Sequence, residues 1–140
     1  MSIYGYKGFN KDLRCRGFQY EIGKTYEMEE EPILCERGFH FCEKLIDVSS
    51  YYPFIEYDVN YGDYGFKIMN FNKSSNRYCV VEAIGDVCED KELQYDTKHA
   101  TNRIRIVREL DQKEISDILY KENPSSSLYT LYTTIYSPIL

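Results

Sequence analysis

Glu82 is the side chain in this sequence whose surroundings most clearly suggest chemistry. It interrupts an apolar run over residues 77–84, where Val80 and Ile84 would share its face in a strand. Burial there would raise the pKa of the carboxyl group unless a cation or backbone donors compensate. Perturbed carboxylates gather at functional sites and also in structural ion pairs. The sequence favours a buried pair with an arginine, and a catalytic or ligand-binding role for Glu82 stays open.

His40 and the nearby cysteines form a second group. His40 and Cys42 would share one face of a short strand over residues 38–42, and Cys35 precedes them. A zinc site needs about four thiolate or imidazole ligands in a tetrahedron, and the sequence has no C-x-x-C pair. A thiolate–imidazole pair needs direct contact, whereas alternate residues of a strand lie ~6–7 Å apart. We therefore expect no metal and no cofactor, with His40 as a minor catalytic candidate and the cysteines as small hydrophobic residues.

Two basic groups could bind a phosphate or a carboxylate. They consist of Lys7, Lys11, Arg14 and Arg16, and of Lys98, His99, Arg103, Arg105 and Arg108 in an acid-free run. Arg103 and Arg105 would share a strand face and could fork onto such an anion. Tyr6 beside Lys7 would offer a stacking platform for a base. The ligand-binding candidates are therefore Tyr6, Lys7, Arg103 and Arg105. No P-loop or Rossmann fingerprint accompanies them, and pairing with the acidic middle of the chain is favoured over nucleotide binding.

Two further segments could bind a partner protein. Three consecutive glutamates stand before Pro32, and a solvated loop is the simplest interpretation of such a charge run. Residues 128–140 are uncharged and nearly repeat a Leu-Tyr-Thr motif. Tyrosines and aliphatic residues of this kind either dock on the body or meet a partner. The partner-binding candidates are Glu29, Glu30, Glu31, Tyr129, Tyr132 and Tyr136.

The strands that must position these side chains follow from the hydrophobic pattern. Alternation and apolar runs predict strands over residues 3–9, 18–28, 38–42, 77–84 and 101–107. The segment 18–28 should turn at Gly23 and Lys24. The run over 77–84 is apolar on both faces, which indicates a central strand.

Helical periodicity is limited to two segments. One is predicted over residues 43–52, and the other begins at Asp111, where Glu114 completes a capping box. Residues 54–76 favour irregular structure or a weak hairpin, and residues 85–96 an acidic turn. We therefore expect an α+β fold, a small, mainly antiparallel twisted sheet with two or three short helices.

Length and composition bound the class of protein. The chain has 140 residues, 43% of them hydrophobic, and we expect one domain over residues 1–124 with a tail over 125–140. No apolar run could cross a bilayer, and no secretory signal is recognisable. Five irregularly spaced cysteines indicate reduced thiols, hence a host-cell cytoplasm. The net charge of −6, concentrated in residues 26–97, disfavours nucleic acid and anionic membranes as partners.

The order of short motifs suggests a family. The chain carries Tyr6-Lys7-Gly8-Phe9, Cys15-Arg16-Gly17-Phe18-Gln19-Tyr20, Gly38-Phe39-His40-Phe41-Cys42-Glu43 and Val81-Glu82 with Gly85-Asp86. As a set over residues 4–108, they resemble a small domain of unknown function that is common in phages and prophages, often in front of pentapeptide repeats. This sequence has no pentapeptide repeat and carries the Tyr/Thr tail instead. The resemblance implies a phage setting and no particular activity.

A more distant similarity is to ADP-ribosyltransferase-like folds. Those folds begin with a strand that holds a His or Arg beside an aromatic residue and a glycine, and they end on a strand with a catalytic Glu. Tyr6-Lys7-Gly8, the segment from Gly38 to Tyr51, and Glu82 occur in that order. Lys7 stands where the His or Arg would be.

The leading hypothesis is a phage-type, non-enzymatic binding module that inhibits a bacterial defence component through contact with a host or phage protein. The alternative is a nucleotide-handling domain, either an ADP-ribosyltransferase-like enzyme or a protein that sequesters a signalling nucleotide, which would use Tyr6, Lys7, His40 and Glu82. A third hypothesis is a virion or assembly accessory protein whose tail drives homo-oligomerisation.

Overall fold

The computed structural model describes residues 2–33, 37–89 and 96–123. Its strands are β1 (Ile3–Phe9), β2 (Arg14–Cys15), β3 (Phe18–Gln19), β4 (Thr25–Glu27), β5 (Phe39–Cys42), β6 (Ile55–Tyr61), β7 (Lys67–Lys73), β8 (Arg77–Ala83), β9 (Val87–Glu89), β10 (Lys98–Thr101) and β11 (Arg103–Glu109). Its helices are α1 (Leu45–Val48), the 3-10 helix η1 (Asp63–Gly65) and α2 (Gln112–Glu122).

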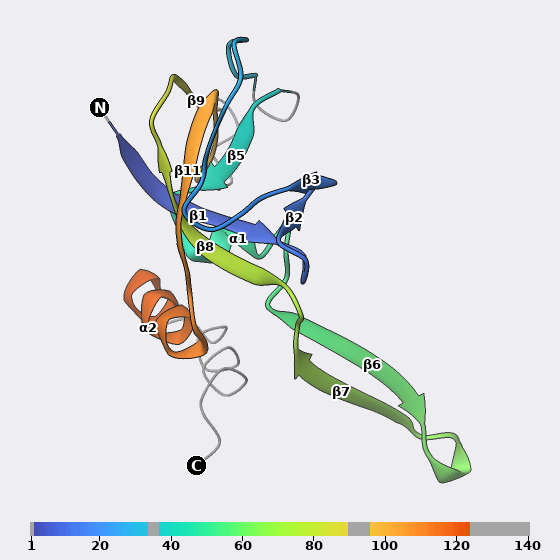
Figure 1. Cartoon of the computed structure of the whole chain (residues 1–140). Helices are drawn as coiled ribbons and strands as arrows, with labels where there is room; N and C mark the ends of the chain where they lie inside the picture. The colour runs from blue at the N-terminus through green and yellow to red at the C-terminus, as the bar shows by residue number, and fades with distance from the viewer. Residues whose placement is uncertain (1, 34–36, 90–95, 124–140) are drawn as a thin grey trace.

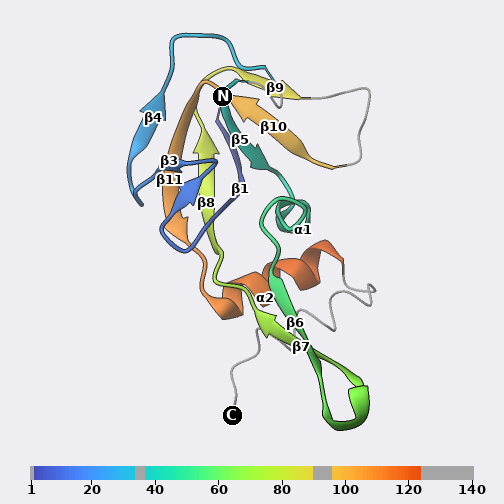
Figure 2. The ribbon, with the colours of Figure 1, turned by 90° about the vertical axis from the view of Figure 1, so that its right-hand side faces the viewer.

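Seven strands form one antiparallel sheet in the order β4-β11-β8-β1-β5-β10-β9 (Figures 1 and 2). β8 lies between β11 and β1, and its consecutive residues Tyr78 and Cys79 are both buried, so the prediction of a central strand is confirmed. The predicted α+β class with a mainly antiparallel sheet is also confirmed. The described residues form two α-helices, fewer than the upper number predicted, and α2, with 11 residues, is longer than the short helices expected. Neither α-helix in the described ranges is long and apolar enough to cross a membrane.

The two faces of the sheet have different covers. On one face, the segment around β2 and β3 buries Leu13, Cys15 and Tyr20 against a core that includes Val81. On the other face, α1 and α2 pack around Tyr78. Figure 2 shows the two helices close together beneath the sheet. Since side chains alternate along a strand, Tyr78 and Val81 point to opposite covers.

β1 and β5 are paired at one point of their length. Tyr6 opposite Cys42 is the only pair in their register, whereas β1 pairs with β8 along all of its residues from Ile3 to Phe9. Gly8 lies in the part of β1 that diverges from β5. A Cβ atom on Gly8 would lie 2.8 Å from both Tyr52 Cβ and Val48 Cγ1. The glycine therefore allows the turn after α1 to lie directly against β1.

The helix predicted over residues 43–52 is shorter than expected. α1 ends at Val48, and the chain continues through hydrogen-bonded turns. The Ser49 hydroxyl donates to the Ile46 carbonyl at 2.6 Å and competes with the helical backbone for that acceptor. The carboxylate of Glu122, in α2, accepts from the backbone N–H groups of Leu45 and Ile46 at 2.7 and 3.0 Å. α1 is held by this tertiary contact more than by its own sequence.

The strand predicted over residues 101–107 is wrong at its start. The chain leaves β10 after Thr101 and enters β11 at Arg103, and these two strands lie in different parts of the sheet. Asn102 sits at the break, where its side-chain oxygen accepts from the Asp86 N–H at 2.9 Å. The alternation of Ile104 and Ile106 continues within β11 as predicted, with both side chains buried.

Two other local predictions hold. Asp111 accepts from the Glu114 N–H at 2.8 Å and Glu114 accepts from the Asp111 N–H at 3.3 Å, which confirms the capping box of α2. The predicted turn in the segment 18–28 is also present, with Gly23 at φ +90°. The two halves of that segment pair with different neighbours, β3 with β2 and β4 with β11.

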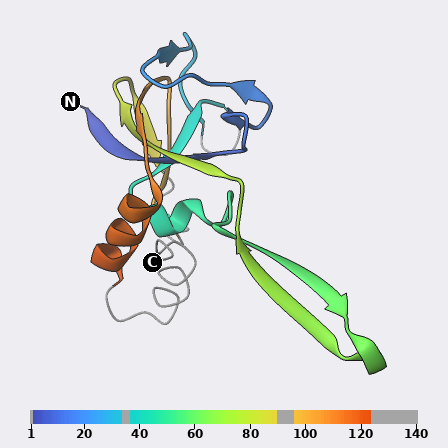
Figure 3. The same ribbon diagram turned by 60° about the horizontal axis from the view of Figure 1, so that its bottom comes forward.

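Residues 55–73 form a separate two-stranded hairpin, which we call the arm. β6 and β7 pair over seven consecutive positions, from Ile55 opposite Lys73 to Tyr61 opposite Lys67. Tyr64 and Gly65, at φ +69° and +76°, turn the chain at the tip. The arm projects away from the sheet and from both helices (Figures 1 and 3). Of the two alternatives predicted for this segment, the hairpin is the one observed.

Candidate functional site

A cavity of about 520 Å³ opens where β1 and β5 diverge. Its walls come from these two strands, from the turn between β2 and β3, from the end of α1 with the turn after it, and from β10. Three cationic side chains line it, those of Lys7, Arg16 and Lys98. Tyrosines 6, 51 and 52 and His40 line it as well. The cavity therefore combines positive charge with aromatic surface.

Lys7 is a buried cation at the inner wall, with 4% of its surface exposed. Its Nζ atom donates to the His40 carbonyl at 2.6 Å, in the region where β1 and β5 are not paired through their backbones. The ammonium group also lies 5.3 Å from the ring centroid of Tyr20, within cation–π range. Burial lowers the pKa of Lys7, because the charged form loses hydration. An anion in the cavity would offset that loss.

His40 and Cys42 have perturbed protonation at the same wall. Burial, assisted by the positive charges of Lys7 and Lys98, lowers the pKa of His40 to about 4, so the imidazole is neutral near pH 7. Burial raises the pKa of the Cys42 thiol to about 12, and the thiol is protonated at that pH. A protonated thiol is a weak nucleophile. His40 and Cys42, which the sequence predicted to be unsuited to thiolate–imidazole chemistry, are therefore both uncharged near pH 7.

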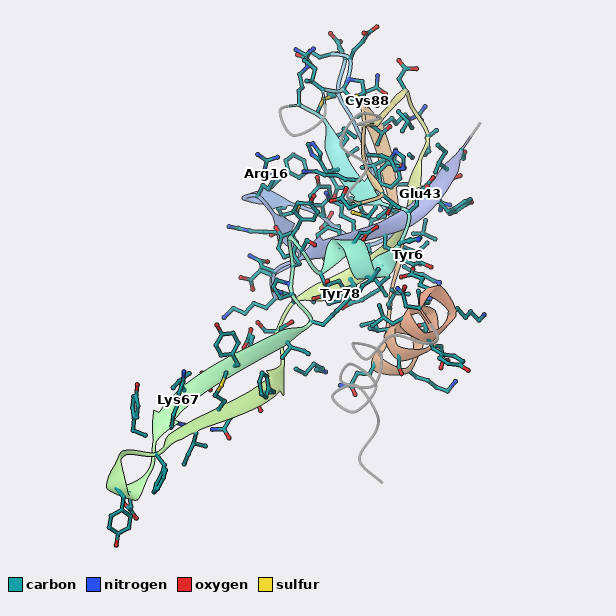
Figure 4. The ribbon with its side chains drawn as sticks, turned by 180° about the vertical axis from the view of Figure 1, so that it is seen from behind. Tyr6, Arg16, Glu43, Lys67, Tyr78 and Cys88 are labelled. Atoms are coloured by element: carbon teal, nitrogen blue, oxygen red, sulfur yellow. The ribbon has the colours of Figure 1, made fainter. Side chains whose placement is uncertain are left out.

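The turn between β2 and β3 presents Arg16 at the cavity. Arg16 and Gly17 have φ values of +52° and +82°, as a two-residue type I′ hairpin turn requires. The Arg16 backbone N–H donates to the Tyr52 hydroxyl at 3.2 Å, which ties the turn to the segment after α1. Figure 4 shows Arg16 at the edge of the body, on an exposed turn. Its guanidinium group can therefore approach a ligand from solvent.

Tyr51 and Lys98 form the opposite side of the opening. The Lys98 Nζ atom lies 4.5 Å from the Tyr51 ring centroid, a cation–π geometry. The Tyr51 hydroxyl donates to Asp96 at 2.6 Å, which fixes the orientation of the ring. Tyr51 nevertheless remains 46% exposed, so part of its surface is accessible to a ligand.

The charges of this lining have one sign. Among the described residues that line the cavity, three are cationic and none is an aspartate or a glutamate. The three cations come from β1, from the β2–β3 turn and from β10, which are far apart in the sequence. Converging cations suit a phosphate or carboxylate, and arginine can bind either through two hydrogen bonds. Asp96 lies directly behind this lining, where it accepts hydrogen bonds from the Tyr51 hydroxyl and the Lys98 N–H.

The predicted ligand-binding residues fall into two places. Tyr6 and Lys7 line the cavity together with His40. Arg103 and Arg105 project from β11 and pair with acidic side chains of the middle of the chain. Arg103 Nε lies 3.7 Å from a carboxylate oxygen of Glu27, and Arg105 lies 3.0 Å from Glu82. Both arginines therefore pair with the acidic middle of the chain, which is what the sequence favoured over nucleotide binding.

Glu82 does not line the cavity with the other candidates. Its register partner on β1 is Tyr4, and its neighbour on β11 is Arg105. Hydrogen bonds from Ser2 and then from Arg105 lower the pKa of Glu82, although burial acts in the opposite direction. The carboxylate is therefore ionised near pH 7 and held in an ion pair. The pairing with an arginine is the role that the sequence favoured, but the pair is partly exposed and not buried as predicted.

The remaining candidates lie elsewhere or outside the described residues. Glu29, Glu30 and Glu31 are exposed in the segment between β4 and β5. The described residues contain no group of three or more His, Cys, Asp or Glu side chains that could hold a metal ion. Outside the described residues lie Cys35, Tyr129, Tyr132 and Tyr136.

Four charged or aromatic residues of the cavity were not among the final ligand-binding candidates from the sequence: Arg16, Tyr51, Tyr52 and Lys98. Arg16 and Lys98 belong to the two basic groups, but their sequence separation hides their proximity. The motif Cys15-Arg16-Gly17-Phe18 contained a usable signal, because an Arg-Gly pair between two short strands indicates an exposed turn.

Comparison with known proteins identifies one family. The sequence matches Domain of unknown function (DUF7666) over residues 3–118, a range that includes every described residue of the cavity. No curated protein and no solved structure matches the chain. The predicted resemblance to a domain of unknown function is confirmed at this level. The chain belongs to the DUF7666 family of domains of unknown function.

Proposed function

We propose that the cavity between β1 and β5 binds a nucleotide or a closely related phosphate-bearing ligand. One observation carries this proposal: Lys7, Arg16 and Lys98 converge on a tyrosine-rich cavity whose described lining includes no carboxylate. The volume of about 520 Å³ lies within the usual range for small-ligand sites, about 300–1,000 Å³. A nucleotide provides both a phosphate for the cations and a base for the aromatic walls.

Each part of such a ligand has a suitable neighbour. Arg16, at the exposed turn, can bind a phosphate through two parallel hydrogen bonds. Lys7, deeper in the cavity, supplies a charge that an anion would stabilise. A base stacked on a tyrosine contributes about 1–3 kcal/mol without strong sequence preference, and Tyr51 retains exposed surface for that contact.

The arrangement supports binding more than group transfer. If the chain followed the order of motifs in ADP-ribosyltransferase-like folds, Glu82 would be the catalytic carboxylate. Here Glu82 is paired with Arg105 and lies outside the cavity lining. We therefore propose a protein that sequesters its nucleotide unchanged. In the phage setting that the sequence resemblance implies, the ligand would be a signalling nucleotide of a bacterial defence system.

A thermal-shift and calorimetric screen of the whole chain tests this proposal. The panel contains NAD, ADP-ribose, and linear and cyclic di- and trinucleotides. A ligand at 100 times its dissociation constant should stabilise the fold by ~2.7 kcal/mol. Chromatography of the recovered ligand should show it intact, and Glu82→Gln should leave its affinity unchanged. If no nucleotide in the panel binds, the proposal fails.

Two arginines separated by one residue provide a matched pair of variants. Arg16→Gln removes a cation from the cavity, whereas Arg14→Gln removes an exposed cation that does not line it. Loss of a charged hydrogen bond, about 1.5–3 kcal/mol, should weaken binding by at least ~10-fold in Arg16→Gln. Arg14→Gln should bind as the wild type does. Equal losses in both variants would indicate non-specific attraction between the ligand and surface charge.

A second candidate function is the non-enzymatic module that binds a host or phage protein. Glu29, Glu30 and Glu31 favour it, because all three are exposed together on one connecting segment. Reversal of the three charges to lysine should abolish capture of the partner from infected cells without lowering the melting temperature. Capture that survives this reversal would remove the segment from consideration.

A further inference from the structure

The arm has one apolar face and one polar face. Paired residues of an antiparallel hairpin point to the same side, and successive pairs alternate. Every second pair therefore lies on the same side, and one side carries Tyr57 with Phe71, Val59 with Met69, and Tyr61 with Lys67. The pairs on the other side are mostly polar, such as Glu56 with Asn72 and Asp58 with Asn70. The arm is therefore built like a strand pair that covers a core on one side.

The described body covers only the base of this apolar face. Ile55 packs against the helix-side core, and the Ser74 N–H donates to the Phe54 carbonyl at 2.8 Å where the arm joins the body. Beyond that point the face is exposed: Tyr57 by 62%, Tyr61 by 75% and Phe71 by 50%. Figure 4 shows Tyr78 at the junction and Lys67 far along the arm.

Such a hairpin needs a cover. A two-stranded hairpin in water is marginally stable, and a contiguous exposed apolar face marks an interaction site. We propose that a second copy of this chain covers it, with the apolar faces of two arms packed together around a two-fold axis that runs along the arms.

The register of the arm favours a second copy in this orientation. Rotation about such an axis places β6 of one copy over β7 of the other. Tyr57 then lies over the second copy's Phe71, Val59 over its Met69, and Tyr61 over its Lys67. Aromatic pairs and a lysine over a tyrosine are attractive contacts.

The area of the face is sufficient for a modest dimer. Tyr57, Tyr61 and Phe71, at 150–250 Å² each when buried, contribute roughly 350 Å² of their exposed surface. With Val59 and Met69, exposed by 39% and 45%, each copy would bury roughly 500 Å² of apolar side chain. Two copies reach roughly 1,000 Å², the lower range of specific interfaces. We therefore expect a dissociation constant in the micromolar range.

Charge on the two bodies opposes this contact, whereas the arm itself is mixed in charge. The chain has a net charge of −6, so two bodies repel. The arm carries both signs, with Glu56, Asp58 and Asp63 against Lys67 and Lys73. A two-fold axis along the arms places both bodies at the same end of the pair, so the repulsion between them opposes association and the dimer should tighten as added salt screens it.

Sedimentation equilibrium of the full chain across a concentration series tests the dimer. The wild type should shift from monomer to dimer, and Tyr57→Ser with Phe71→Ser should raise the dissociation constant at least ~100-fold, because aromatic side chains dominate such contacts. Asp58→Ser with Asn70→Ser, on the polar face of the same two strands, should dimerise like the wild type. Circular dichroism and the melting temperature at low concentration establish that each variant is folded.

Two results would overturn the proposal. One is a wild type that remains monomeric at about 100-fold above the expected micromolar dissociation constant. The other is a dimer that the apolar-face variant leaves intact, which would place the contact elsewhere on the chain. In the first case, capture of a different protein that requires the apolar face would identify that protein as the occupant.

Discussion

The cavity and the arm use the same residue type for opposite purposes. In the cavity, tyrosines from separate segments stand beside cations that range from buried Lys7 to exposed Arg16, and their contacts are long-range. In the arm, tyrosines alternate along one short hairpin, and their partners are cross-strand neighbours. Composition alone does not separate these roles, because a tyrosine has both an apolar ring and a polar tip. Substitutions in the cavity region, where side chains are more buried and contacts are long-range, should lower the stability of the fold. Substitutions on the exposed face of the arm should affect mainly the association of two chains.

The largest expected difference concerns two glycines. Gly8→Ala should lower the free energy of unfolding by about 2 kcal/mol, because the new methyl group meets Tyr52 and Val48 at 2.8 Å in a packed interior. Gly62→Ala, in the arm, meets mainly the mobile end of Ile68 and should change stability by less than ~0.5 kcal/mol. Urea unfolding measures both. Equal effects would mean that the arm is packed as tightly as the cavity wall.

Tyr78 tests the joint between the two regions. Its hydroxyl donates to the Tyr52 and Pro53 carbonyls at 2.6 and 2.8 Å, directly before the arm. Tyr78→Phe leaves these carbonyls without that donor and should cost about 1–2 kcal/mol in urea unfolding. Tyr57→Phe removes an exposed hydroxyl from the arm and is the control, with no measurable loss expected. A neutral Tyr78→Phe would show that other donors replace the hydroxyl.

Acid should weaken the cavity region through His40. Its pKa is about 4 in the folded chain and about 6.5 when unfolded, so the unfolded state binds the proton first. Stability should therefore rise with pH through that window and fall as the pH drops from 6.5 to 4. Partial exposure of the ring reduces the effect to about 1 kcal/mol.

His40→Gln removes this titration and should flatten the dependence of unfolding free energy on pH between 6.5 and 4.5. Urea unfolding at four pH values measures the slope. His99→Gln, on the neighbouring strand β10, is the comparison variant for histidine loss in general. An unchanged slope in His40→Gln would assign the acid sensitivity to carboxylates.

The smallest effect is expected in the arm at high dilution. Phe71→Ser should shift the unfolding free energy of the monomer by less than ~0.5 kcal/mol, since the exposed ring contacts little besides its cross-strand partner. The melting temperature at a concentration well below the expected micromolar dissociation constant measures it. A shift of several degrees would show that the arm belongs to the same cooperative unit as the body.

Local patterns in the sequence were sufficient for several elements. β1, β5, β8 and the capping box of α2 were predicted at or near their observed positions, because alternation and cap chemistry act over a few neighbouring residues. The sequence also predicted that Glu82 pairs with an arginine, without saying which one, since an isolated carboxylate in an apolar strand requires a compensating charge. Its partner, Arg105, was set by the register of β8 with β11.

Tertiary structure alone decided the candidate site. The divergence of β1 from β5, and the convergence of Arg16 and Lys98 on Lys7, depend on pairings between distant segments that no local pattern specifies. The same dependence explains the errors. The change from β10 to β11 at Asn102 follows from strand order, and the short α1 follows from its contact with Glu122. The sequence by itself determined the strands with a strong local pattern, such as β1 and β8, and which residues carry charge. Long-range pairing decided which of those charges meet, because side chains far apart in sequence become neighbours only through the register of the sheet.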